Sequence, residues 1–156
     1  MYEWLKVFHV IAVVLFLGNI ITGVYWHKHA LRTGDPRAIA IAMRGVIGSD
    51  RLFTMPGVFA IIATGVGMAL VTGWPIFGTP WILWSIVLFG VSGAVFGMRL
   101  APLQRRMAGF AEAAAASGNF DRAAYEAMSR QWDFWGAVAT IAPLGALALM
   151  VLKPAF

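Results

Sequence analysis

A histidine lies inside the first apolar stretch of the chain. His9 is one of three histidines and falls within Val7 to Trp26, a run without Lys, Arg, Asp or Glu. A helix of about 20 apolar residues crosses the hydrocarbon of a bilayer. An ionisable side chain placed there costs about 3 kcal/mol unless it has a partner, so it is by default a candidate for function. His9 is therefore the first candidate site residue.

An imidazole in an apolar setting can hold haem iron, either alone or with an axial methionine. If the second and fourth predicted spans both run outward, Met68 and Met150 approach the depth of His9. Lys6 lies one turn before His9, and its ammonium group can extend outward to a haem propionate. These residues define a candidate haem b site, with His9 as the iron ligand, Met68 or Met150 as a second ligand and Lys6 near a propionate.

The competing interpretation of His9 is structural. Polar groups in membrane helices pair across helices, so His9 can donate to a hydroxyl such as Ser85 or Thr140, and from the residues alone we prefer this interpretation. His27 and His29 lie 18 and 20 residues beyond His9, about 27 to 30 Å along a helix. They cannot complete a bis-histidine haem site with His9 in one chain, and we interpret them as interfacial anchors.

The composition indicates a lipid environment. Hydrophobic residues make up 60% of the 156 residues and charged residues 12%, whereas about a quarter of the residues in a soluble domain are charged. The net charge of +5 comes from basic residues beside apolar segments, which fits membrane orientation better than nucleic-acid binding. There is no cysteine, and phosphate-binding, dinucleotide and metalloprotease motifs are absent. None of the acidic residues is expected deep in a span.

These patterns predict an all-α membrane protein with four transmembrane helices in one domain, residues 1–156. Asp35 can cap a short amphipathic helix that begins at Pro36, and we expect this helix to lie in the interface between spans one and two. The third helix is expected to continue into water as far as Ser117 and to return from Asp121, which makes a helical hairpin before span four. The spans are expected at about 4–26, 53–72, 81–98 and 134–152.

The basic residues predict an orientation. Ten of the 12 Lys and Arg residues lie in the connections after spans one and three. The positive-inside rule places those connections in the cytoplasm and both termini outside. The tryptophans agree with this orientation, because they cluster at the expected ends of the spans.

Small residues recur at a spacing of four on two helices. Gly93 and Gly97 form one such pair, and Gly18 and Thr22 form another. Pairs of this kind let helix backbones approach closely in a membrane. We expect packing within the bundle, and the alternative is a face for a second protein or a second copy.

A proline falls inside the fourth span. Pro143 has no N–H group, so the carbonyl of Ala139 loses its partner in the helix. Such kinks line cavities in some transporters, but an isolated one more often only bends the helix. We therefore expect a bend at this position.

Several segments resemble one known family. LKVFHVIAVVLFLGNIITGVYW, RTGDP, DRLFTMPGVFAIIATG, PLQRRM and WGAVATIAPLGALALMVLKP resemble, in this order, the bacterial integral membrane proteins grouped as domain of unknown function 2269. The resemblance spans nearly the whole chain and implies no activity. We accordingly expect a multi-pass protein of the bacterial inner membrane.

A more distant pattern involves Lys6, His9 and the DRL segment with the proline that follows it. A Lys three residues before a His in an opening span is similar to HemJ-type protoporphyrinogen oxidases and to CopD-type copper-resistance proteins. This similarity implies that His9 is a haem ligand.

Two functions remain open. The first is a haem-associated membrane protein with a redox or porphyrin-related role. The second is a non-enzymatic accessory or scaffold subunit that docks on a larger membrane complex through the Gly93 and Gly97 face. A transporter is less favoured, because no acidic residue is expected in mid-membrane to couple an ion. The residues assign no reaction and no substrate.

Overall fold

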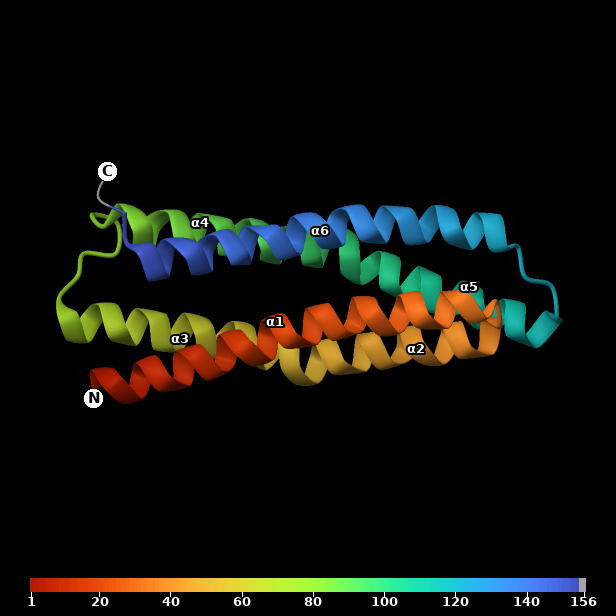
Figure 1. Cartoon of the computed structure of the whole chain (residues 1–156), viewed down its shortest axis with the longest axis horizontal. Helices are drawn as coiled ribbons and strands as arrows, with labels where there is room; N and C mark the ends of the chain where they lie inside the picture. The colour runs from red at the N-terminus through yellow and green to blue at the C-terminus, as the bar shows by residue number, and fades with distance from the viewer. Residues whose placement is uncertain (155–156) are drawn as a thin grey trace.

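The computed structural model describes residues 1–154 and contains four long helices that run side by side (Figure 1). Each is long and apolar enough to cross a membrane, which confirms the predicted four-helix membrane bundle. The second and third long helices are each built of three continuous elements. The elements in chain order are α1 (Tyr2–Thr33), α2 (Pro36–Ser49), η1 (Asp50–Thr54), α3 (Met55–Thr72), α4 (Pro80–Val95), η2 (Phe96–Leu100), α5 (Ala101–Ser117) and α6 (Arg122–Leu152).

The helix boundaries follow from local residues. Asp35 and Asp121 cap the helices that follow them, because their carboxylates accept hydrogen bonds from the backbone N–H groups of Arg37 at 2.8 Å and Ala124 at 2.9 Å. α1 ends at Gly34, which has a φ of 71°. Residues with a side chain rarely adopt that conformation, so glycine suits this position. The predicted N-cap Asp35 and the predicted helix start at Asp121 are thereby confirmed.

The segment after Pro36 is helical as predicted, but it does not lie apart as an interfacial helix. α2 continues through η1 into α3 and packs against α1 and α5. Its apolar face includes Ile39 and Met43, which are both fully buried. The physical reason is that a helical partner, α5, covers this face, and no helix-breaking residue separates Ser49 from Met55.

Two π-helical turns interrupt the long helices, and each precedes a proline. η1 ends two residues before Pro56, and η2 ends two residues before Pro102. A proline cannot donate to the preceding turn and its ring crowds it, and a wider turn relieves both problems. The third long helix changes its packing partner at η2. Before η2, α4 packs against α6, and after η2, α5 packs mainly against α2. Figure 1 shows α5 crossing from α6 toward α2.

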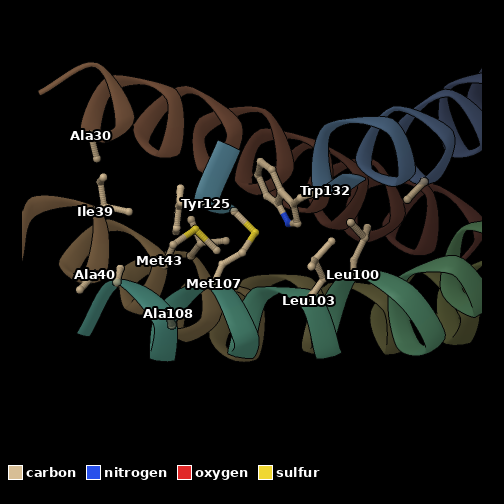
Figure 2. Packing of buried hydrophobic residues seen from close by; sticks show 13 residues of the cluster. Ala30, Ile39, Ala40, Met43, Leu100, Leu103, Met107, Ala108, Tyr125 and Trp132 are labelled. Atoms are coloured by element: carbon tan, nitrogen blue, oxygen red, sulfur yellow. The ribbon is translucent and has the colours of Figure 1, made fainter. Parts of the chain in front are cut away.

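The two ends of the bundle differ in packing. We call the end with the α1–α2 and α5–α6 connections the basic end, and the end with both termini and the α3–α4 connection the termini end (Figure 1). The hydrophobic core lies toward the basic end, where Met43, Met107, Tyr125 and Trp132 gather between α2, α5 and α6 (Figure 2). Burial of apolar side chains in such a core holds helices together where they leave the lipid and enter water.

At the termini end the helices pack in two pairs. α1 packs against α3, and α4 packs against α6, whereas no extensive packing joins the pairs within residues 1–154. One contact between them is made by the rings of Phe16 and Phe89, whose centroids are 5.6 Å apart. Large apolar side chains such as Phe59 and Ile141 are exposed there. Such exposure is favourable in lipid, so this end contacts the bilayer.

Candidate functional site

His9 on α1 faces α3 and contacts one hydroxyl group. Its Nδ1 lies 2.9 Å from Oγ1 of Thr64, and this hydroxyl donates to the carbonyl of Ala60 at 2.5 Å. Since a hydroxyl has only one hydrogen, Thr64 must accept from Nδ1, which fixes the hydrogen of the neutral ring on that nitrogen. The Nε2 atom therefore keeps its lone pair, and within residues 1–154 it makes no hydrogen bond.

The hydroxyl partner of His9 is of the expected type but comes from another helix. Ser85 donates to the carbonyls of Trp81 and Ala146, and Thr140 donates to its own helix. The physical reason is that α1 pairs with α3 and not with α4 or α6. The ring also lies beside Gly65, where an added Cβ atom would make van der Waals contact with Cε1 of His9 at 3.4 Å.

The other predicted haem residues are dispersed. Met68 is half-buried and lies one turn beyond Thr64 on α3. Met150 is on α6, in the other helix pair, and Lys6 is exposed on α1. Within residues 1–154 no group of three His, Cys, Asp or Glu residues could hold a bare metal ion. A single imidazole is enough to hold haem iron, which takes four of its ligands from the porphyrin.

A second polar site lies near the middle of the bundle and was not predicted. Asp50 is the first residue of η1, is 8% exposed and accepts three hydrogen bonds. Its Oδ1 accepts from Asn19 Nδ2 at 3.0 Å and from Thr54 Oγ1 at 2.8 Å, and its Oδ2 accepts from Gln104 Nε2 at 2.9 Å. Asn19 also donates to Thr54 at 2.9 Å. Side chains of α1, η1 and α5 thus converge on one carboxylate.

The burial of Asp50 corrects the expectation that no acidic residue reaches into a span. Asn19 lies seven residues before Trp26 in the charge-free run of α1, about 10 Å from the predicted interface. Asp50 meets it there because α2 runs antiparallel along α1. Two signals pointed to this site, namely a polar Asn19 within an apolar run and the i,i+4 spacing of Asp50 and Thr54.

His27 lies just beyond the charge-free run and is buried in the core of the basic end, which corrects its interpretation as an anchor. It is 0% exposed, and its Nε2 lies 3.1 Å from Oγ of Ser129. Its ring contacts Tyr125 and Trp132 at centroid distances of 6.0 and 5.0 Å. Burial and the charge of Lys28 lower the pKa of His27 to about 4. His27 is therefore neutral at pH 7.

A groove of about 680 Å³ runs between α1 and α2 on the outer surface. Small side chains line most of it, and Trp26 and His29 lie at its edge. One end of the groove reaches Asn19 and Ser49, the neighbours of Asp50 in space and in sequence. The polar site around Asp50 is therefore adjacent to a surface opening.

Within residues 1–154, the glycines of the small-residue pairs have open space at their Cβ positions. A Cβ atom added at Gly18, Gly93 or Gly97 would meet no atom within 4 Å. Thr22 turns its hydroxyl to the carbonyl of Gly18, 2.8 Å away in the same helix. Close packing on these faces therefore requires a neighbouring molecule.

Comparison with known proteins gives one match. A family model described as "Predicted integral membrane protein (DUF2269)" matches residues 3–154. The match includes His9, the Asp50 site and all four long helices. No curated protein and no solved structure matches the chain. The more distant similarity to HemJ-type and CopD-type proteins is not among these findings.

Proposed function

The chain belongs to the DUF2269 family of predicted integral membrane proteins, and we propose that it binds haem b through Nε2 of His9 in a redox or porphyrin-related role. The observation that carries this proposal is the Nδ1 hydrogen bond to Thr64. A histidine that ligates a metal usually donates its other ring N–H to a fixed acceptor. Thr64 supplies that acceptor and leaves the ligating nitrogen free.

The remaining residues have supporting roles in this proposal. Met68 would be the preferred second residue to hold the haem, because it lies on α3, which packs against α1. Met150 would serve only if the two helix pairs close on the cofactor. Lys6 is exposed one turn before His9, where its ammonium can pair with a propionate.

The proposal is tested by an optical spectrum of protein purified after expression with a haem precursor. We expect a Soret band in the wild type that is lost in His9→Ala. His29→Ala is the matched control, because His29 is exposed near the basic end, about 30 Å along α1 from His9. This control should keep the band. An equal loss in both variants, or a band that persists in His9→Ala, would contradict the assignment of His9.

A second candidate function is an accessory subunit that docks through the outer face of α4 and η2. The observation that favours it is that Gly93 and Gly97 share an exposed face with no atom near their Cβ positions. Gly93→Leu should abolish co-purification with a membrane partner or a second copy. Gly136→Leu is the control, since a Cβ atom there also meets nothing within 4 Å. A partner-free, monodisperse wild type would count against docking.

A further inference from the structure

Asp50 is a buried carboxylate whose hydrogen-bond partners are all neutral. Asn19, Thr54 and Gln104 each donate to it, and within residues 1–154 it forms no ion pair. Hydrogen bonds from neutral groups stabilise a carboxylate but do not cancel its charge. A buried charge without a counter-charge is costly, so a positive charge that neutralises the Asp50 carboxylate is expected nearby.

The neighbouring elements offer no counter-charge. α3 has no charged residue, and α1 has none between Lys6 and Lys28. Arg51 on η1 and the two arginines that follow Gln104 on α5 are exposed. The nearest basic residues of α1 and α2 already have partners, because Lys28 pairs with Asp133 and Arg44 pairs with Glu112. The missing positive charge must therefore come from outside the chain.

We propose that Asp50 is a binding site for a small monovalent cation, either H⁺ or Na⁺, that neutralises the buried carboxylate. The carboxylate and the Thr54 hydroxyl offer oxygen atoms directly. The amides of Asn19 and Gln104 offer oxygen atoms after rotation of their terminal groups, because amides carry both a donor and an acceptor end. This set of oxygen ligands suits a hard cation.

The surroundings provide access and a means of response. The groove between α1 and α2 reaches Asn19 and Ser49, so a cation can approach from the basic end. The site begins the π-helical turn η1, and Gln104 follows the second π-helical turn, η2. Occupancy at Asp50 therefore changes the contact between the two interrupted helices.

The inference is independent of haem and is tested by thermal unfolding of the purified full-length protein in detergent. Wild type and Asp50→Asn are compared in NaCl and in choline chloride at equal ionic strength, and across pH at constant salt. If Na⁺ is the occupant, NaCl raises the Tm of the wild type in a saturable way and leaves Asp50→Asn unchanged. If H⁺ is the occupant, NaCl has no effect, and the Tm difference between the two proteins changes with pH.

The contributions of other titrating groups, such as His27, cancel in this comparison because both proteins contain them. Asp50→Asn keeps the site hydrogen-bonded if Gln104 rotates its amide, so we expect this variant to fold. Glu126→Gln is the control. It loses the surface ion pair with Arg122 but should keep the wild-type response to the cation.

Thr54→Val is the second variant, and it also serves if Asp50→Asn cannot be purified. It retains the carboxylate but removes one oxygen ligand. If Na⁺ is the occupant, we expect the Na⁺ concentration at half-effect to rise about tenfold, the factor that 1.4 kcal/mol represents. If H⁺ is the occupant, we expect the proton concentration at half-effect to fall about tenfold, because the charged carboxylate loses the hydrogen bond that Thr54 donates to it. A wild type and an Asp50→Asn variant that respond identically to Na⁺ and to pH would overturn the proposal, as would an unchanged half-effect in Thr54→Val.

Discussion

The Ser92 hydroxyl donates to the carbonyl oxygen of Ala139 at 2.6 Å and so joins α4 to α6. This carbonyl is the one that Pro143 deprives of its helical N–H partner. Seven residues earlier on α4, Ser85 lies 3.2 Å from the carbonyl of Ala146. In membrane helices, serine side chains from neighbours commonly satisfy backbone groups freed by proline. The proline in α6 is thus compensated across the helix pair.

This relationship predicts a coupled effect on stability. Ser92→Ala leaves the Ala139 carbonyl buried without a partner and should lower the free energy of unfolding by about 1 kcal/mol. In a Pro143→Ala background, the helix itself supplies the partner, so the same substitution should cost less. A double-mutant cycle by denaturant unfolding in detergent measures the coupling. Equal costs in both backgrounds would show that Ser92 and Pro143 act independently.

Thr64 should control how tightly haem is held. Thr64→Val removes the acceptor for Nδ1 of His9 while keeping a similar shape, so the imidazole is no longer oriented. Loss of such a supporting contact typically weakens metal affinity by about 10-fold to 100-fold. Titration of the purified apoprotein with haem measures this. Thr140→Val is the control, because Thr140 bonds only to its own helix. Equal affinities in both variants would remove the supporting role of Thr64.

His27 should make the protein sensitive to acid. Its pKa is about 4 in the folded state and about 6.5 when exposed, so the unfolded state binds more protons between these values. The contribution of His27 to the free energy of unfolding is therefore fully present above pH 6.5. It is lost as the pH drops toward 4, by about 3 kcal/mol in total. Unfolding of wild type and His27→Gln between pH 4 and 7 tests this. The variant should lose less stability on acidification, and parallel curves would contradict the prediction.

The orientation is open to a direct test. Ten basic residues in the connections after spans one and three predict that the basic end faces the cytoplasm and that both termini face outward. A phosphatase reporter fused after the last residue should be active in intact cells, because it folds only outside the cytoplasm. A fluorescent reporter that matures only in the cytoplasm should stay dark there. The reverse pattern would invert the proposed topology.

The presence of four long helices was predictable from the sequence, but the continuity of α2 with α3 and the pairing of the helices were not. Charge-free runs and the capping residues Asp35 and Asp121 are local signals, and they indicated the four helices. The exchange of partners at η2 depends on how two prolines are accommodated in three dimensions. Without that exchange, neither the Asp50 contact with Gln104 nor the packing of α2 on α5 could be inferred.

For the polar sites too, single residues could be recognised in the sequence, but their partners on other helices could not. His9 was recognisable because a histidine is rare within an apolar run, whereas its partner Thr64 depends on the pairing of α1 with α3. The position of His27 after Trp26, in a polar cluster, predicts an interfacial anchor. Its burial results from the packing of α6 against the end of α1. The sequence did contain one signal for the Asp50 site. Asn19 is a polar residue within an apolar run, which indicates that it has a polar partner on another helix.

His9 is proposed to bind haem iron through its free Nε2 atom, and the haem content of the purified wild-type protein measures this most directly. A reduced-minus-oxidised spectrum with a pyridine haemochrome assay gives the number of haem groups per chain. We expect about one b-type haem per chain, bound through an imidazole nitrogen. A colourless protein after expression with added haem precursor, with the fold intact by circular dichroism, would contradict it.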